Sequence, residues 1–178
     1  MRVIAGRWGG RRLAAPKGAA TRPTSDRVRE ALFSILGDRV QDARVLDLFA
    51  GSGALGLEAL SRGAAEVTFV DSAAAAVAAV KANLAALGGE AEVHRSDGLR
   101  FLRGAPGKAR HYDLVLLDPP YRLAARLGRE LSEALPGVLA PAALVVSESD
   151  RRAPLPLDLP LRDERRYGDT LIRIHDPR

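Results

Sequence analysis

A glycine-rich turn between an apolar strand and a helix constrains the fold of this chain more than any other feature. Residues 47–56 read Asp-Leu-Phe-Ala-Gly-Ser-Gly-Ala-Leu-Gly, between an apolar run and a segment with helical spacing. Glycines at such a point permit a tight turn and let a ligand approach the backbone closely. The segment therefore predicts the first strand, loop and helix of a parallel sheet that binds a cofactor at one edge.

The rest of the chain alternates between strand and helix patterns. We expect strands at 44–49, 66–70, 90–94, 112–117 and 143–148, and helices at 53–62, 73–87, 99–103 and 124–135. Runs at 161–167 and 170–175 flank Gly168-Asp169 and predict a hairpin. Together they predict an α/β, Rossmann-like, mostly parallel seven-stranded sheet with an antiparallel edge strand and helices on both faces.

The N-terminal part is expected to form a small β-hairpin and a helix. Runs 2–5 and 11–14 flank Gly9-Gly10, and the apolar spacing after Thr24 predicts a helix that ends near Gly37. Residues 1–40 hold nine Arg or Lys and three Asp or Glu, although the whole chain of 178 residues has a net charge of only +5. All the excess positive charge therefore lies here, which favours a polyanionic partner over a merely solvated surface.

Composition excludes several classes of site and protein. The chain has no cysteine, and its three histidines, His94, His111 and His175, are scattered, so disulfides and a metal cluster are not expected. No apolar run approaches the roughly 20 residues of a membrane span, and the N-terminus lacks the apolar region of a signal peptide. We expect a cytoplasmic protein without a membrane or metal partner. Asn, Gln, Met and Cys are almost absent, which fits a thermophile, and a GC-rich genome would give the same bias towards arginine, alanine and proline.

The glycine-rich turn also matches the dinucleotide fingerprint, so a nicotinamide enzyme is one candidate. Asp71 ends the next strand, where a carboxylate can bind a ribose diol of either cofactor. Asp47 favours S-adenosylmethionine (SAM), because a carboxylate there would repel a pyrophosphate but attract the ammonium group of a methionine. Asp97 follows the third strand and can accept a hydrogen bond from adenine. Without a ligand, Asp71 is a turn residue and Asp97 a helix N-cap.

Asp118-Pro119-Pro120-Tyr121 ends the strand expected at 112–117, where ligands of parallel sheets bind. An exocyclic purine amine is a poor nucleophile, because its lone pair is delocalised into the ring. Two acceptors, Asp118 and the Pro119 carbonyl, favour the pyramidal geometry in which that lone pair can attack. The prolines hold the turn rigid, and Tyr121 can stack on an extruded base. The two motifs predict methyl transfer to nitrogen; a proline-rich turn without a chemical role is the alternative.

The motifs occur in the order typical of class I SAM-dependent methyltransferases, and the flanking sequence narrows the resemblance. Residues 2–6, 10–13 and 22–33 and the run from 47 to 63 resemble one bacterial family, the RsmD-type guanine-N2 methyltransferases of 16S ribosomal RNA. The resemblance covers nearly the whole chain. It implies N2-methylguanosine formation within an assembled or assembling small subunit. It also implies a monomer, with a basic RNA-binding extension at 1–40 packed on a methyltransferase domain at 41–178.

The resemblance implies three sets of site residues. SAM would be bound by Asp47, Leu48, Phe49, Gly51, Ser52, Gly53, Asp71, Ser72, Ser96, Asp97 and Gly98. The guanine would be held by Asp118, Pro119, Pro120 and Tyr121. RNA would be contacted by Arg2, Arg7, Arg11, Arg12, Arg22, Arg27 and Arg29, unless some of these pair with acidic neighbours within the protein. Trp8 replaces a more usual polar residue, and it either stacks on RNA or packs in the protein.

Three other functions are compatible with parts of the sequence. A DNA adenine-N6 methyltransferase shares Asp-Pro-Pro-Tyr, but it usually needs a separate target-recognition domain. A protein-glutamine methyltransferase usually carries Asn at the position of Asp118, and it has no need of a basic N-terminal segment. A non-catalytic rRNA-binding assembly factor has no use for the turn from Asp118 to Tyr121.

Overall fold

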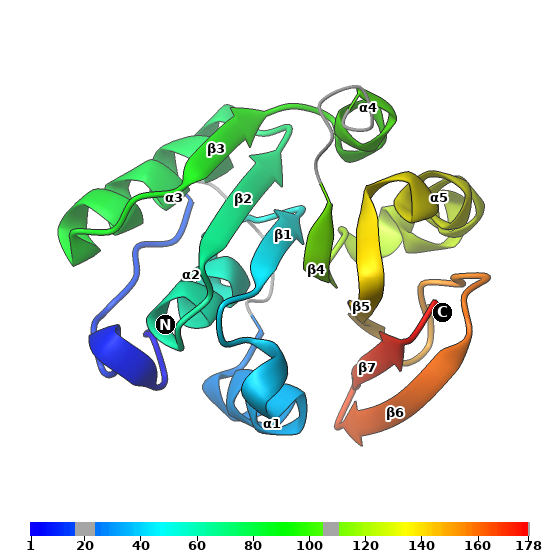
Figure 1. The fold of residues 1–178 in the computed structure, drawn as a ribbon, viewed down its shortest axis with the longest axis horizontal. Helices are drawn as coiled ribbons and strands as arrows, with labels where there is room; N and C mark the ends of the chain where they lie inside the picture. Colours follow the sequence, from blue (N-terminus) through cyan, green and yellow to red (C-terminus); the bar gives the residue numbers. More distant parts are fainter. Residues whose placement is uncertain (17–23, 105–110, 178) are drawn as a thin grey trace.

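The computed structural model describes residues 1–16, 24–104 and 111–177, in which one seven-stranded sheet is covered by helices on both faces (Figure 1). The strands are β1 (Arg44–Leu48), β2 (Glu66–Asp71), β3 (Glu92–Arg95), β4 (Tyr112–Leu117), β5 (Leu139–Asp150), β6 (Leu161–Tyr167) and β7 (Thr170–His175). The α-helices are α1 (Asp26–Leu36), α2 (Ala54–Ser61), α3 (Ala74–Leu87), α4 (Gly98–Gly104) and α5 (Tyr121–Ala134). Short 3-10 helices are η1 (Gly6–Trp8), η2 (Gly37–Arg39) and η4 (Leu135–Val138).

The sheet has the strand order β3-β2-β1-β4-β5-β7-β6. Strands β1 to β5 pair in parallel, whereas β7 pairs antiparallel with both β5 and β6. After β3 the chain crosses to the other side of β1, where β4 and β5 are added, so β1 and β4 lie side by side at the switch point where ligands of open α/β sheets bind. The prediction of a mostly parallel sheet with an antiparallel edge is confirmed.

Alternate residues of each strand point into two separate cores, as strand geometry requires. Val45 and Leu116 belong to the core beneath α1, α2 and α3, whereas Leu46 and Leu117 belong to the core beneath α4 and α5. Both faces are covered, which explains why residues 114–117 of β4 form a continuous apolar run. The same alternation places Asp47 on the face covered by α1, α2 and α3.

The N-terminal segment, residues 1–16, packs on α2 instead of forming the two strands predicted there. Arg2 and Arg12 make a single antiparallel bridge, and η1 lies between them. The buried carboxylate of Glu58 in α2 accepts hydrogen bonds from Ile4 N at 2.6 Å and Ala5 N at 3.1 Å. Because a side chain of α2 satisfies these backbone groups, the two runs meet without becoming a regular hairpin.

Local signals set most helix ends. The Ser25 side chain accepts a hydrogen bond from Val28 N and caps α1, which ends at Gly37 with a φ of +50°. Two elements begin three or more residues before their predicted starts. Helix α5 begins at Tyr121, directly after Pro120, because a proline is tolerated at the start of a helix. Strand β5 is twelve residues long, since its ends pair with β4 and β7 beyond the apolar centre.

Replacing Glu58 with Ala is expected to lower the free energy of unfolding by about 3–5 kcal/mol. The change removes the acceptor of two backbone N–H groups and the partner of Arg62, whose Nε lies 2.6 Å from Glu58 Oε1. Urea denaturation measures the difference. Glu133→Ala is the matched control, because Glu133 and Arg129 have the same i,i+4 spacing but are exposed. Its cost should not exceed about 0.5 kcal/mol, and equal costs would contradict the anchoring role of Glu58.

Candidate active site

Asp71, at the end of β2, connects the loops that follow β1 and β3. Its Oδ2 accepts a hydrogen bond from Gly51 N at 2.9 Å, and its backbone carbonyl accepts one from Ser96 N at 3.0 Å. Its Oδ1 accepts a third from Ala73 N at 2.8 Å. The structure thus brings the sequence-predicted cofactor residues of the first three strands to one edge of the sheet.

The loop after β1 has a backbone that few residues can adopt. The φ angles are +73° at Phe49, +56° at Gly51 and +79° at Gly53. This region favours glycine, and a non-glycine residue held there costs about 1–3 kcal/mol and is typical of ligand sites. Apart from Gly51 and its two chain neighbours, no atom of the described residues lies within 4 Å of a Cβ built on Gly51. The loop therefore has an open side on which a ligand can lie against the backbone.

Asp47 lies behind this loop and not on its open side, where direct contact with an ammonium group was expected. It is 1% exposed, and its Oδ2 accepts a hydrogen bond from Gly56 N at 2.9 Å. A Cβ on Gly56 would lie 2.3 Å from the Phe69 ring. Burial raises the pKa of Asp47 to about 7, with a further rise from the charge of Asp71, although the Gly56 bond lowers it. Asp47 therefore shapes the loop from beneath.

Asp97 caps α4, which is the alternative role that its sequence position allowed. Its Oδ1 accepts a hydrogen bond from Arg100 N at 3.0 Å, and its side chain is exposed. A carboxylate has about four acceptor positions, so the exposed Asp97 retains capacity for a further donor. Of the remaining predicted cofactor residues, Leu48 and Gly98 are buried, Ser52 and Ser96 are half-buried, and Ser72 is exposed.

The Asp118-Pro119-Pro120 turn leaves β4 beside this edge. Asp118 is half-buried, Pro119 is buried and Pro120 is exposed; the side chain of Tyr121 lies outside the described part of the structure. Burial raises the pKa of Asp118 well above its usual range, and the negative charges of Glu148 and Asp47 raise it further.

Glu148 on β5 is an acidic neighbour that sequence reasoning missed. It is 3% exposed, and its Oε2 accepts a hydrogen bond from the Thr24 hydroxyl at 2.6 Å. Burial raises its pKa, whereas the Thr24 bond and the positive charge of Arg29 lower it. A lone glutamate in an otherwise buried strand was the available signal, because buried acidic groups need a specific partner.

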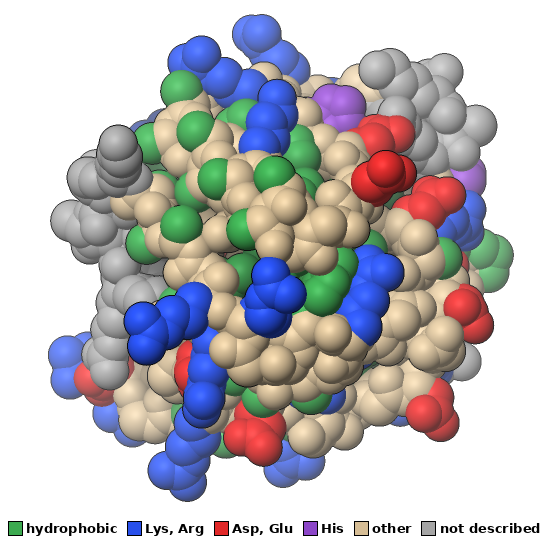
Figure 2. All heavy atoms as spheres, turned by 90° about the vertical axis from the view of Figure 1, so that its left-hand side faces the viewer, with side chains coloured by type: hydrophobic (Ala, Val, Ile, Leu, Met, Phe, Trp, Pro, Cys, Tyr) green, Lys and Arg blue, Asp and Glu red, His purple; other side chains and the backbone are tan. Residues whose placement is uncertain are grey.

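Lys and Arg side chains project from the side of the molecule on which the N-terminal segment and α3 lie (Figure 2). The N-terminal segment contributes the exposed Arg7, Arg11 and Arg12 to the described surface. The Arg7 guanidinium lies 3.9 Å from the centroid of the Trp8 ring, and Arg11 Nη2 donates to Ala86 O at 2.7 Å. Three predicted RNA-binding residues thus share one exposed segment.

The other predicted RNA-binding arginines differ in exposure. Arg29 is completely buried, and its Nη2 donates to Arg2 O and Asp26 Oδ1, both at 2.6 Å. A contact between Arg29 and RNA was therefore the wrong expectation, because α1 packs this side chain inside the protein. Arg2 is exposed and pairs with Asp26 at 3.0 Å, and Arg27 is exposed. Arg22 lies outside the described residues.

Two buried side chains hold the N-terminal segment against α3. Trp8 is 7% exposed and packs on Gly89, where a Cβ would lie 2.6 Å from the indole, so it packs in the protein. Asn83 Oδ1 accepts from Ala14 N at 2.8 Å, and its Nδ2 donates to Ser52 O at 2.9 Å. Asn83, which sequence reasoning also missed, thereby connects the N-terminal segment to the glycine-rich loop.

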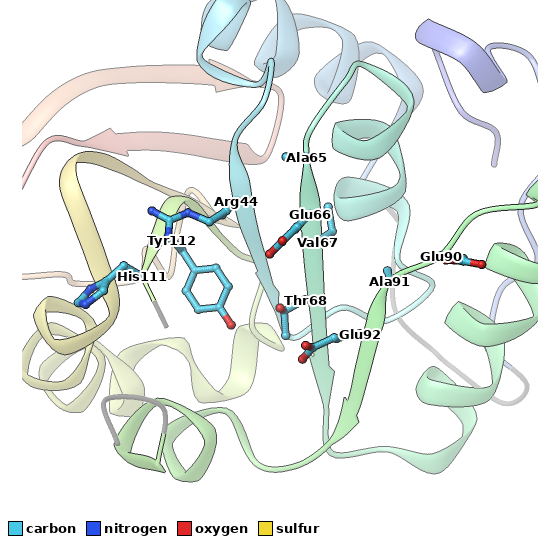
Figure 3. A pocket seen from close by; sticks show the side chains of 10 residues that line it. All are labelled: Arg44, Ala65, Glu66, Val67, Thr68, Glu90, Ala91, Glu92, His111 and Tyr112. Atoms are coloured by element: carbon cyan, nitrogen blue, oxygen red, sulfur yellow. The ribbon is translucent and has the colours of Figure 1, made fainter. Parts of the chain in front are cut away.

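A hollow of about 550 Å³ opens at the opposite edge of the sheet, where the strands begin (Figure 3). Its lining includes the first residues of β1 to β4, namely Arg44, Glu66, Glu92 and Tyr112. Ligands of such sheets bind at the carboxyl ends of the strands, so we place the functional site at the other edge. Within residues 1–16, 24–104 and 111–177, no cluster of three or more His, Asp or Glu side chains is arranged to hold a metal ion.

Known proteins resemble this chain in both sequence and structure. A Thermus thermophilus protein described as hypothetical has a solved structure with a TM-score of 0.85 and 32% identity, over 99% of each chain. A T. thermophilus 16S rRNA N2 guanine methyltransferase, solved with AdoMet and guanosine, shares the fold with a TM-score of 0.73. It is 24% identical, over 92% of this chain and 45% of that one.

The sequence comparisons cover nearly all of the chain. The family model described as conserved hypothetical protein 95 matches residues 1–176. Ribosomal RNA small subunit methyltransferase D of Escherichia coli is 44% identical over 183 residues, which cover 98% of this chain and 89% of that protein. With this identity along its whole length, the chain belongs to the RsmD family of ribosomal RNA small subunit methyltransferases.

Proposed function

We propose that this protein transfers a methyl group from SAM to the exocyclic N2 amine of a guanine in 16S ribosomal RNA. The observation that carries the proposal is the placement of Asp118 directly after β4, beside the glycine-rich loop after the neighbouring strand β1. A methyl donor on that loop and an amine at Asp118 would meet at one edge of the sheet, and such proximity is a large part of catalysis.

The loop residues suit SAM as the methyl donor. The open side of Gly51 admits a ligand against the backbone, and Asp71 and Asp97 offer acceptors for ribose hydroxyls and an adenine amine. The buried Leu48 and Gly98 would take part through their backbone, and Ser52, Ser72 and Ser96 line the same edge. When bound, SAM supplies a methyl group on a positively charged sulfur. The half-buried Asp71 and the exposed Asp97 place negative charge at this edge, which favours a cationic ligand.

Asp118 and the Pro119 carbonyl would accept hydrogen bonds from the two hydrogens of the guanine amine. This arrangement favours a pyramidal nitrogen with its lone pair directed at the methyl group. As the nitrogen becomes positive, the Asp118 carboxylate stabilises it, an interaction stronger in the transition state than in the ground state. The two prolines keep both acceptors in place before the substrate arrives. Tyr121 is proposed to stack on the extruded base.

The exposed arginines of the N-terminal segment are proposed to bind RNA phosphates, with residues 1–40 as the RNA-binding extension of a catalytic domain at 41–178. Arg7, Arg11 and Arg12 offer three charges close together on one surface. The described helices include none long and apolar enough to cross a membrane. We propose that the protein acts as a monomer on small subunits in the cytoplasm.

Asp118→Ala is expected to reduce single-turnover methyl transfer to undermethylated small subunits by about 10²–10³, with SAM affinity nearly unchanged. Asp118→Asn should lose less, because the amide oxygen still accepts a hydrogen bond but carries no charge. Calorimetry with SAM is the control for an intact cofactor site. Parent-like transfer by Asp118→Ala would place the reacting site elsewhere.

Asp71→Ala is expected to raise the Kd for SAM about 10- to 100-fold. The change removes the proposed ribose acceptor and the bond that holds Gly51 N. Asp113→Ala is the matched control, because Asp113 also accepts a backbone hydrogen bond, from Arg44 N at 2.8 Å, but at the opposite edge. Isothermal titration should show weaker binding in the first variant alone, and no comparable binding of NAD to the parent. Unchanged SAM affinity in folded Asp71→Ala would refute the assignment.

Replacing Arg7, Arg11 and Arg12 together with Ala is expected to weaken RNA binding and flatten its salt dependence. Each lost phosphate contact lowers the slope of log K against log salt by about 0.7–0.9. The control replaces Arg162, Arg165 and Arg166 of β6, which pair with nearby acidic side chains. Filter binding over a series of salt concentrations measures this slope for the parent and both variants. If the first variant keeps the parent's slope, this segment is not the RNA surface.

A further inference from the structure

The hollow at the amino ends of the strands contains a buried hydroxyl group without a hydrogen-bond partner. Tyr112 of β4 lines this hollow and is 4% exposed. Within residues 1–16, 24–104 and 111–177, no group hydrogen-bonds its hydroxyl oxygen. Buried polar groups nearly always have a partner, and leaving one unpaired costs free energy. A ligand in the hollow that hydrogen-bonds this hydroxyl would remove that cost.

Two polar side chains of β2 lie on the same face of the sheet as Tyr112. Val70 and Tyr112 both belong to the core beneath α4 and α5, and strand alternation places Thr68 and Glu66 on the face of Val70. In Figure 3 the Tyr112 hydroxyl points towards β2, and the Glu66 and Thr68 side chains project from β2 towards the ring. Strand β1 separates β4 from β2, so their backbones are about 9–10 Å apart. The tyrosine crosses only part of this gap.

Carboxylates outnumber cations around the hollow. Three exposed glutamates line it, namely Glu66, Glu90 and Glu92. The arginine of the lining, Arg44, is already bound to Asp113, with Nε 3.1 Å from Oδ2 and Nη2 3.3 Å from Oδ1. The exposed His111 also lines the hollow, and Glu92 pairs with His94 at 2.9 Å. Although the whole chain has a net charge of +5, this hollow therefore favours a cation.

The number and kind of acceptors suit a primary ammonium group. Such a group has three N–H donors and no acceptor. Glu66 offers carboxylate oxygens, and Thr68 and Tyr112 each offer a hydroxyl oxygen. A guanidinium group instead has five donors fixed in one plane, which match the two oxygens of a single carboxylate. The three acceptors come from two separate strands, so the compact ammonium group fits them better.

We propose that this hollow binds a primary alkylammonium group, which donates hydrogen bonds to Glu66, Thr68 and Tyr112. Its volume of about 550 Å³ is within the range of small-molecule sites. Ala65 and Ala91 of the lining offer apolar surface to the alkyl chain. The same group is carried by free aliphatic polyamines and by lysine side chains. The hollow lies at the edge opposite the glycine-rich loop, so its occupation leaves the proposed SAM site open.

An NMR titration of the ¹⁵N-labelled protein at low salt tests the site with two amines. The first is 1,4-diaminobutane, and the second is Nα-acetyl-lysine methylamide. Both should shift the amide signals of Glu66, Thr68 and Tyr112 in a saturable way and leave that of Gly51 unchanged. The amine with the lower Kd identifies the source of the group. Tetramethylammonium has the same charge but no N–H donor, so its Kd should be at least about tenfold higher.

Two variants test the assigned acceptors. Glu66→Gln removes the charged acceptor and should raise the Kd of both amines about tenfold or more. Tyr112→Phe keeps the ring and removes only the hydroxyl group, so it should raise the Kd about 3- to 10-fold. Asp169→Asn is the control, because Asp169 is also an exposed acid near an arginine, 3.5 Å from Arg152, but lies in the β6–β7 hairpin. Its Kd should equal that of the parent.

Urea denaturation tests the unpaired hydroxyl separately from binding. Without amine, Tyr112→Phe should unfold at a urea concentration no lower than the parent, because the lost hydroxyl has no partner. Saturating amine should raise the midpoint of the parent more than that of the variant. A lower midpoint of Tyr112→Phe without amine, equal affinity for tetramethylammonium, or an unchanged Kd in Glu66→Gln would each overturn the site. Neither SAM nor RNA is present, so these outcomes are separate from a failure of the proposed function.

Discussion

The hydrogen bond from Gly56 N to the buried Asp47 carboxylate requires α2 to lie against the sheet with no side chain between them. A Cβ on Gly56 would enter the Phe69 ring, so this approach is open to glycine alone. With α2 held so close to β1, the chain must turn within a few residues, and it does so through left-handed φ angles at Phe49, Gly51 and Gly53. The open side of the loop and its contact with Asp71 both depend on that turn.

Three acidic side chains lie close together at this edge of the sheet, and their burial lowers the stability of the fold. Asp47, Asp118 and Glu148 occupy three adjacent strands, and burial raises the pKa of each. For Asp47, the pKa of about 7 in the folded protein exceeds the ordinary pKa of 3.8. Asp47 contributes fully to stability at a pH below its ordinary pKa. This contribution is lost as the pH rises through the folded-state pKa of about 7. The buried Asp47 carboxyl group therefore reduces the stability of the fold near neutral pH.

The elements with a strong local signal were predictable from sequence. The glycine spacing, the apolar spacing after Thr24 and the strand patterns of β1 and β4 placed the loop, helix and strands that build the site. The partners of isolated polar residues were not predictable, because they lie far away in the chain. Glu148 meets Thr24 across 124 positions and Asn83 meets Ala14 across 69, so no local pattern records them. Arg29 was predicted to lie on the surface because of its charge, and this prediction was wrong because the side chain is buried.

The N-terminal segment is attached through backbone hydrogen bonds as well as through its buried Val3, Trp8 and Leu13 side chains. Glu58 binds the amides of Ile4 and Ala5, and the Ser61 hydroxyl accepts from the amide of Trp8 at 3.0 Å. Amides are common to nearly every residue, so these contacts place few demands on the side chains that the segment displays. Gly6 is an exception, because a Cβ there would collide with Ser61 O. Evolution can therefore alter the exposed arginines, which we propose bind RNA, while these backbone contacts of the segment persist.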